Sequence, residues 1–368
     1  MEFQIAAEEL AKALHRAQGI AERKTTIPIL ANVLLQANKG GVSVTAFDLD
    51  IGLVTEHPAE VLQEGAITLS SKHLFDLVRV LPESKVRLKR TGNNAVEITC
   101  GSAHFKLLGM PAEEYPALPK EEKSALVKAD GKTLLEMIQK TAFAISTDDT
   151  RYILNGLFFE ATDKGTIRTV ATDGHRLCIA ERKMEGDFKL NRGVTLPRKG
   201  LFELRRLIEE APDAECFLGF GDTSAVFKKS GLSMIMRLLD GQFPDYKEVI
   251  PREPQKSLKL SRSGLLETLK RISLLSEEKS HAVRLELTEN QLRVSSQNPD
   301  LGEAREDMPV TYTGEKVEVG FNARYLLDVL AVITTDEVLL EMADEQSPGV
   351  LRPVGDASYT AVIMPMRI

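Results

Sequence analysis

The segment "SLKLSRSGLLETLKRIS" (Ser257–Ser273) decides the fold, because the chain contains three versions of it. A short alternation of apolar and polar residues is followed by a polar break and then by leucines at helical spacing. "FQIAAEELAKALHRA" (Phe3–Ala17) and "ALVKADGKTLLEMIQKT" (Ala125–Thr141) have the same order. Alternation predicts a strand, and apolar residues four apart predict one buried face of a helix. The residues that we expect in the core from these helices are Leu10, Leu14, Leu134, Ile138, Leu265 and Leu269.

A second helical motif recurs at nearly the same pitch. Its versions are "LSSKHLFDLVRVLP" from residue 69, "LPRKGLFELRRLI" from residue 196 and "FNARYLLDVLAVI" from residue 321. Paired alternating runs separated by Gly, Asn or Asp lie between the two helical motifs and predict hairpins. Asp48, Asp173 and Asn298 take equivalent places in these hairpins, 125 residues apart each time. The aligned leucines of the second motif are Leu74, Leu201 and Leu326.

These landmarks predict three α+β units of about 120 residues, each with the order strand, helix, strands, helix, strands. Stretches that contain Pro and Gly, at 109–124 and 241–257, separate the units. We therefore expect domains at 1–121, 122–253 and 254–368.

The composition is that of a soluble globular protein, with 43% hydrophobic and 27% charged residues among 368. No apolar run reaches about 18 residues, so we expect no membrane span. The three cysteines are isolated in sequence, which predicts reduced thiols in a cytoplasmic protein and no metal site. The chain has no P-loop or other nucleotide-binding motif, so we expect no cofactor.

The net charge of −7 argues against a protein that grips nucleic acid tightly through phosphate contacts. A local basic surface is still compatible with it, because the field depends on where the charges lie. Arg16, Lys140 and Arg271 occupy equivalent positions on the proposed helices. Their recurrence favours one basic lining built from helices, although solvated surface cations are the plainer interpretation of each residue alone.

The stretch "VATDGHRL" (Val170–Leu177) raises the question of catalysis. Asp173 and His175 could act as an acid–base pair, since His titrates near neutral pH. An Asp-Gly turn at the end of a strand is the structural alternative. No nucleophile motif of the G-x-S-x-G type and no zinc motif accompanies the pair, so we expect a non-catalytic protein.

Five motifs in order carry a resemblance over essentially the whole chain: "RYILNGLFFE", "TVATDGHRL", "LPRKG", "DGQFPDY" and "VIMPMRI". With them the chain resembles the DNA polymerase III beta subunit, or sliding clamp, family of bacteria. The resemblance implies a processivity factor in which two subunits join head to tail as a ring around duplex DNA. Six similar domains would form the ring, with helices lining the hole and sheets outside. A monomeric scaffold of three adaptor domains is the competing class.

The resemblance also implies partners and a groove that binds their linear peptides. The partners are the DNA polymerase III alpha subunit, the clamp loader delta subunit, other DNA polymerases and mismatch-repair proteins. Apolar walls with several methionines suit a site that has many clients, and His175, Arg176 and Arg367 would hold polar groups at its rim. The implied groove residues are Leu154, Thr172, Gly174, His175, Arg176, Leu177, Pro244, Val249, Asn322, Tyr325, Ser347, Pro348, Val362, Ile363, Met364, Pro365, Met366 and Arg367.

Two further surfaces follow from the same resemblance. The implied DNA contacts are Lys24, Lys72, Arg79, Thr147, Arg151, Tyr152, Lys199 and Arg206. The implied subunit interface pairs Phe105 and Leu107 with Leu274 and Leu275, for which ordinary core positions are the alternative. We expect the terminal "VIMPMRI" to form an edge strand, because of Pro365 and its short remainder, although a buried terminal strand is the alternative.

Overall fold

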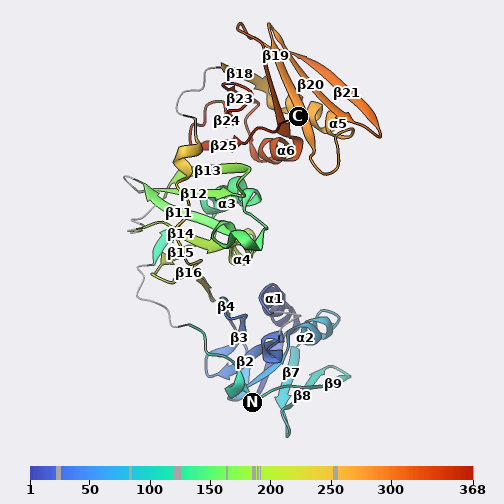
Figure 1. Ribbon diagram of the computed structural model, residues 1–368. Coiled ribbons are helices and arrows are strands. Elements are labelled where there is room, and N and C mark those ends of the chain that lie inside the picture. The colour runs from blue at the N-terminus through green and yellow to red at the C-terminus, as the bar shows by residue number, and fades with distance from the viewer. Residues whose placement is uncertain are drawn as a thin grey trace. The chain divides into compact units, whose positions relative to one another are not determined.

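Three copies of one α+β arrangement follow one another in the computed structural model (Figure 1). The structure describes residues 1–21, 26–82, 85–119, 126–162, 165–184, 188, 190, 192–251 and 256–367. Within these residues each repeat has a strand, a helix, a group of strands, a second helix and three further strands. The order predicted from the sequence is therefore confirmed.

The elements of the first repeat are β1 (Glu2–Ala6), α1 (Ala7–Ala17), β2 (Asn32–Asn38), β3 (Gly41–Phe47), β4 (Ile51–His57), β5 (Glu60–Gln63), β6 (Gly65–Ser70), α2 (Ser71–Val78), β7 (Lys85–Arg90), β8 (Ala95–Cys100) and β9 (Ala103–Leu108). Those of the central repeat are β10 (Val127–Ala129), α3 (Gly131–Thr141), β11 (Gly156–Thr162), β12 (Thr166–Thr172), β13 (Arg176–Lys183), β14 (Val194–Pro197), α4 (Arg198–Glu209), β15 (Cys216–Phe220), β16 (Ser224–Lys229) and β17 (Leu232–Arg237).

The elements of the third repeat are β18 (Lys256–Ser261), α5 (Arg262–Ser273), β19 (Ala282–Thr288), β20 (Gln291–Asn298), β21 (Gly302–Pro309), β22 (Val317–Asn322), α6 (Ala323–Val332), β23 (Glu337–Met342), β24 (Gly349–Pro353) and β25 (Tyr359–Ile363). Short 3-10 helices lie between these elements: η1 (Pro28–Ala31), η2 (Ala112–Glu114), η3 (Ala142–Ala144), η4 (Asp149–Leu154) and η5 (Tyr246–Val249). Among the helices of the described ranges, none is long and apolar enough to cross a bilayer.

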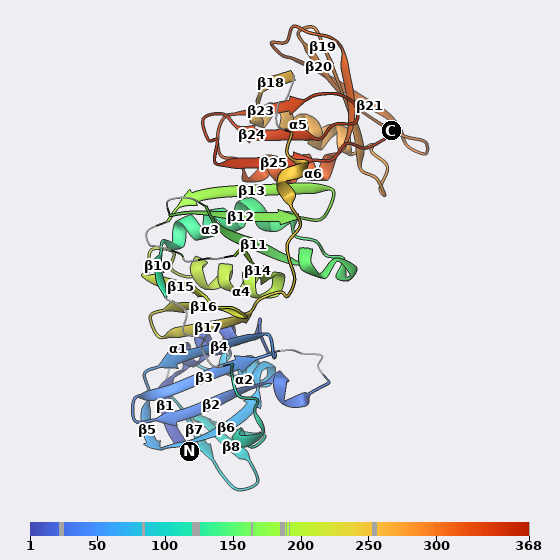
Figure 2. The same ribbon diagram turned by 60° about the vertical axis from the view of Figure 1, so that its left-hand side comes forward.

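Neighbouring repeats share sheets. The strand orders are β5-β1-β7-β8-β9, β10-β15-β16-β17-β4-β3-β2-β6, β14-β11-β12-β13-β25-β24-β23-β18 and β21-β20-β19-β22. The last strand of one repeat thus pairs antiparallel with a strand of the repeat before it: β17 with β4, and β25 with β13. Figure 2 shows β13 and β25 side by side.

Because sheets are shared, the compact units of the chain differ from its sequence repeats. Met1–Lys132 and Lys199–Leu238 form one unit. Thr133–Met184, Phe188–Arg198 and Leu239–Ile368 form the other. The division passes through the central repeat, whose strands belong partly to each unit.

Capping side chains mark the starts of three helices, and the helices bury the faces that their sequences predict. Side chains of Ser70, Ser261 and Asn322 accept backbone N–H groups at the starts of α2, α5 and α6, which satisfies donors that a helix start leaves free. Figure 1 shows α5 and α6 side by side against the strands of the third repeat. All the leucine and isoleucine residues expected in the core are buried, at no more than 1% exposure: Leu10, Leu14, Leu74, Leu134, Ile138, Leu201, Leu265, Leu269 and Leu326.

The equivalent residues Asp48, Asp173 and Asn298 make the same turn in all three repeats. A side-chain oxygen of each accepts the N–H groups of the second and third residues after it. For Asn298 the two distances are 2.9 and 3.3 Å, and its amide group also donates to the Ser276 carbonyl at 3.3 Å. The residue at this position therefore forms a turn in each repeat, because its side-chain oxygen accepts backbone N–H groups at the turn.

Replacing this turn former should destabilise the third repeat. Asn298 is 8% exposed, so Asn298→Ala leaves the Asp300 N–H and the Ser276 carbonyl without these partners, whereas the Leu301 N–H keeps the backbone carbonyl of residue 298. We expect a loss of about 1–3 kcal/mol of stability, measured as a lowered thermal midpoint. Asp300→Ala is the control, because this neighbouring carboxylate is exposed and its loss should change little. Equal midpoints for the two variants would contradict the assigned role.

Candidate functional site

The turn between β12 and β13 is held by the side chains of Asp173 and Arg151. Asp173 Oδ1 accepts the N–H groups of His175 at 2.9 Å and Arg176 at 3.0 Å. Gly174 has φ +88, a left-handed conformation that glycine adopts without strain. Arg151 donates to the Asp173 carbonyl at 2.8 Å and so fixes the outside of the turn.

Asp173 and His175 do not form a catalytic pair. Among the contacts of the described residues, the imidazole of His175 makes no hydrogen bond to the Asp173 carboxylate. The imidazole is exposed and lies against the ring of Tyr325, with centroids 6.5 Å apart. Asp173 serves the turn and Arg176, and His175 presents a flat polar ring at the surface.

Arg176 crosses from the turn to the third repeat. Its guanidinium donates to Asp173 at 3.1 Å, Asp328 at 2.6 Å and the Phe143 carbonyl at 2.6 Å. It also lies over the rings of Tyr325, at 4.5 Å, and Phe143, at 5.2 Å. Burial alone would lower the pKa of Arg176, but the bonds to Asp328 and the charge of Asp173 raise it, so the cation persists.

Contact of Arg176 with peptide groups at a groove rim stays a prediction. Its side chain is 10% exposed, and Nε, Nη1 and Nη2 each donate to one protein acceptor. Within the structure Arg176 is also a positioning residue for Tyr325, whose ring it covers. Sequence reasoning missed Phe143 and Asp328, because nothing in a short motif identifies partners that lie 33 and 152 residues away.

The apolar residues of the predicted groove divide into a floor and an exposed rim. Leu154, Leu177 and Val362 are buried in one cluster with Phe243 and Tyr246, which come from the segment "DGQFPDY". The residues of the predicted set that are exposed, Gly174, His175, Pro244, Val249, Met364 and Arg367, lie around that cluster's elements. Thr172, Asn322, Tyr325, Ser347, Pro348, Pro365 and Met366 are partly exposed, whereas Ile363 is buried.

The end of the chain differs from the expected edge strand. β25 lies between β13 and β24, and Val362 and Ile363 are 1% exposed. The strand ends before Pro365, so that residue disturbs no ladder. Met364 then donates its N–H to the His175 carbonyl at 2.8 Å, and Met366 donates to the Gly320 carbonyl at 2.8 Å. The buried-strand alternative is correct for β25, and only the residues after it reach the surface.

The three recurring helix cations are all ion-paired to carboxylates. Arg16 Nη2 contacts Glu210 at 2.6 Å, and Arg271 Nη2 contacts Glu306 at 2.5 Å. Lys140 is buried and contacts Glu136 at 2.8 Å and Asp356 at 3.3 Å. Lys140 is too buried for a surface lining, whereas for Arg16 and Arg271 the basic lining stays a prediction.

The residues predicted to contact DNA lie in two kinds of environment. Lys24 is outside the described residues. Lys72, Arg79, Thr147, Arg151 and Tyr152 are exposed, with Tyr152 at 55%. Lys199 is paired with Asp48, and Arg206 donates to the carbonyls of His15 at 2.9 Å and Arg16 at 2.6 Å, at the end of α1. Lys199 and Arg206 therefore contact other parts of the fold, and a contact of these residues with DNA stays a prediction.

The four apolar residues assigned to the subunit interface are not core residues. Leu274 is 77% exposed and Phe105 is 40% exposed, and Leu107 and Leu275 are partly exposed. Phe105 and Leu107 lie on β9, which is at the edge of its sheet within the described ranges. Exposed apolar side chains on an open strand edge are typical of a surface that another chain covers.

Comparisons with known proteins agree with this architecture over the full chain. Models of the DNA polymerase III beta subunit match residues 1–119 as its N-terminal domain, 128–245 as its central domain and 247–367 as its C-terminal domain. A beta sliding clamp of Caulobacter vibrioides is 37% identical over 374 residues, and one of Vibrio cholerae is 33% identical over 369 residues. Both alignments cover all of this chain and all of the relative.

Solved structures give the same result. A crystal structure of the Caulobacter crescentus beta sliding clamp, at 37% identity, has a TM-score of 0.96 and covers 100% of this chain and 99% of that one. A Pseudomonas aeruginosa sliding clamp bound to griselimycin, at 34% identity, has a TM-score of 0.94 with both chains fully covered. The fold is thus that of a three-domain clamp, a non-catalytic processivity factor for a DNA polymerase. The chain belongs to the DNA polymerase III beta subunit family.

Removing the guanidinium of Arg176 should destabilise the central and third repeats together. Arg176→Ala leaves Asp173 and Asp328 without this partner, and hydrogen bonds to charged groups contribute about 1.5–3 kcal/mol each. We expect a lower thermal midpoint, with little rescue by Arg176→Lys because one ammonium cannot reach all three acceptors. His175→Ala should leave the midpoint unchanged. An unaltered midpoint for Arg176→Ala would refute the positioning role.

Proposed function

We propose that two copies of this chain close head to tail into a ring around duplex DNA. Such a ring would tether the replicative polymerase and other proteins through the surface around Met364 and His175. The observation that carries the proposal is the rule by which the repeats share sheets. Among the described strands, that rule leaves one pair of complementary edges unused in each chain.

Three successive strands, which we call the hairpin strands, follow the first helix of each repeat: β2–β4, β11–β13 and β19–β21. The rule pairs the last strand of each repeat with the third hairpin strand of the repeat before it. β17 follows it with β4, and β25 follows it with β13. The strands left over in the described chain are β9 and β21, which lie at sheet edges. Pairing β9 of one copy with β21 of the other would apply the same rule between chains. Head-to-tail contacts of this kind form a closed ring when the rotation per subunit fits.

The positions of the exposed apolar residues support the same junction. Phe105 and Leu107 lie on β9, and Leu274 and Leu275 directly follow α5. Burying four such side chains against a second copy is consistent with a long-lived interface. Two copies would bring six repeats into the ring, and we retain 1–121, 122–253 and 254–368 as the proposed domains of each.

The charges support loose contact with DNA. Most helix cations discussed above already have carboxylate or carbonyl partners, whereas Lys72 is exposed without an ion pair among the described residues. Cations that are already paired contribute less to phosphate binding, so we expect weak phosphate contacts and a shallow dependence of binding on salt. A closed ring needs no stronger grip, and weak contacts allow it to slide. The site of action would be the bacterial cytoplasm, where the chromosome is.

The surface around β25 suits linear peptides. A buried apolar floor, exposed Met364 and Val249, and the exposed ring of His175 offer apolar contact with a polar margin. We propose that it binds peptide segments of the DNA polymerase III alpha subunit, the clamp loader delta subunit, other DNA polymerases and mismatch-repair proteins.

Topological retention on DNA tests the ring directly. After loading by the cognate clamp loader, the protein should stay on circular plasmid DNA during gel filtration and leave after linearisation. Leu274→Glu should sediment as a monomer and fail to be retained, because a carboxylate would be buried at the junction. The matched control is Leu62→Glu, which alters a 51% exposed leucine on β5 at the opposite edge of the first sheet. Retention that survives linearisation would refute the ring.

A second experiment separates DNA contacts from structural cations. Lys72→Ala should reduce the salt dependence of binding to a short duplex by about one unit of slope, measured by fluorescence anisotropy. Arg16→Ala should lower the thermal midpoint but leave the slope unchanged, since Arg16 is 15% exposed and paired with Glu210. The reverse pattern would overturn these assignments.

A further inference from the structure

One main-chain contact recurs in all three repeats and leads to an open strand edge. After its last strand, each repeat crosses the strand that precedes its second helix. The crossing residue bonds to the residue three positions before α2, α4 or α6. The bonds join Met110 with Thr68 at 3.1 Å, Leu239 with Thr195 at 2.9 Å and Met366 with Gly320 at 2.8 Å.

In the first two repeats, apolar residues that follow the crossing pack over the third residue of the strand after the first helix. Tyr115 and Leu118 pack with a cluster that includes Leu34, the third residue of β2. Phe243 stacks on Phe158, the third residue of β11, with centroids 4.7 Å apart. The covered position therefore holds a large apolar side chain in both repeats.

The third repeat has a charged residue at the covered position. The third residue of β19 is Arg284, which contacts Glu318 of β22 at 2.5 Å. Beside it, cavities of about 600 and 370 Å³ share Glu318, Glu345 and Gln346 in their walls. Together they follow the edge of β22 from Met366 and Arg367 at one end to Lys256 and Lys316 at the other.

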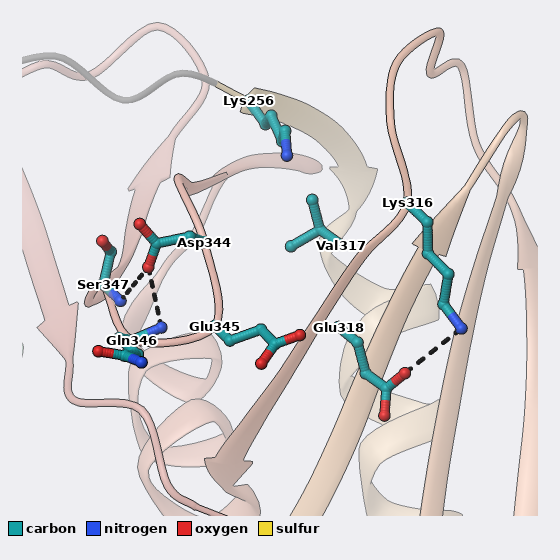
Figure 3. Close-up of a pocket in the computed structure, with 8 residues that line it drawn as sticks. All are labelled: Lys256, Lys316, Val317, Glu318, Asp344, Glu345, Gln346 and Ser347. Atoms are coloured by element: carbon teal, nitrogen blue, oxygen red, sulfur yellow. Dashed lines mark hydrogen bonds and ion pairs between the residues drawn. The ribbon is translucent and has the colours of Figure 1, made fainter.

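Figure 3 shows how the larger cavity is built. The side chain of Lys256 descends from β18, and the loop with Asp344 and Ser347 forms the facing wall. Asp344 accepts the N–H groups of Gln346 at 2.9 Å and Ser347 at 2.8 Å, so the loop has a defined shape. Glu345 extends between this loop and β22.

On the side of the cavities, the backbone of β22 pairs with no named strand among the described residues. β22 pairs with β19 on one side and is the last strand of its sheet within the described ranges. The Gly320 carbonyl points away from β19, since it accepts from Met366. Backbone groups alternate along an antiparallel strand, so the N–H and C=O of Glu318, two residues earlier, point the same way.

We propose that the edge of β22 binds an extended segment of a client polypeptide as an added antiparallel strand, next to the position of Met366. The proposal rests on the proposed peptide groove, because Ser347, Met366 and Arg367 border both that groove and these cavities. The added residues would flank the segment held in the groove. Main-chain hydrogen bonds would supply affinity and would depend little on the amino-acid sequence of the client segment.

The lining identifies the occupant. Cations lie at both ends, Lys256 and Lys316 at one and Arg367 at the other, and the carboxylates of Glu318, Asp344 and Glu345 line the space between. A polar edge with both signs of charge suits a hydrated client flank that carries an acidic residue opposite Lys256. It does not suit the apolar centre of a lasting contact with a second copy.

The test compares two fluorescent peptides on the full-length protein. One contains the clamp-binding motif of the alpha subunit of the same organism's DNA polymerase III, and the other adds five native residues on each side. We expect the longer peptide to bind about tenfold more tightly to the unaltered protein, as one or two net hydrogen bonds would give. Glu318→Pro should abolish this gain, because it removes an outward N–H but no bond to β19.

Matched variants make the outcomes distinct. Glu318→Ala removes the same side chain and keeps the N–H, so the gain should persist, and an unchanged affinity for the short peptide would verify that Glu318→Pro is folded. Equal affinities of the two peptides for the unaltered protein, or a gain that survives Glu318→Pro, would overturn the inference. A shift in sedimenting mass with no effect on the gain would assign the edge to a second copy and also overturn it. Absence of binding by the short peptide would instead refute the proposed groove.

Discussion

Main-chain pairing between successive repeats is the constraint on which the rest of the structure depends. A strand has an alternating pattern of faces, so a slip of one residue would turn every side chain to the wrong side. The register Arg176↔Ile363 between β13 and β25 therefore does more than complete a sheet. It sets which residue of the chain's last segment meets the turn, and Met364 reaches the His175 carbonyl because of it. The candidate groove is a product of this register.

Local patterns in the sequence predict the parts of this fold that depend on local physics. Helical spacing identified Leu10, Leu134 and Leu265 as core residues, and they are buried. The matched places of Asp48, Asp173 and Asn298 became one type of turn, because a short side chain needs only its own next three residues. The joining of sheets across repeats, and the contacts of Arg176 with Phe143 and Asp328, involve distant residues. No spacing in the sequence encodes them, and the predicted edge strand at Val362 was wrong for that reason.

The recurring cations illustrate a second limit. Arg16, Lys140 and Arg271 occupy one helical position, and the sequence alone favours a shared ligand for them. Their carboxylate partners come from different elements, such as the turn before β25 for Asp356 and β21 for Glu306. The recurring position thus carries an ion pair in each repeat, with partners that differ from one repeat to the next. The partners are invisible to a comparison of the repeats, because they lie at positions that are not equivalent.

The sharing of sheets also bears on how such a chain could arise. An ancestor with a single repeat would have had a last strand and a third hairpin strand without partners, and these two strands would lie in different sheets, as β9 and β4 do here. It could satisfy both only by associating with further copies, so closed assembly would precede gene duplication. Each tandem fusion would then turn a junction between molecules into one within a molecule, at a far higher effective concentration.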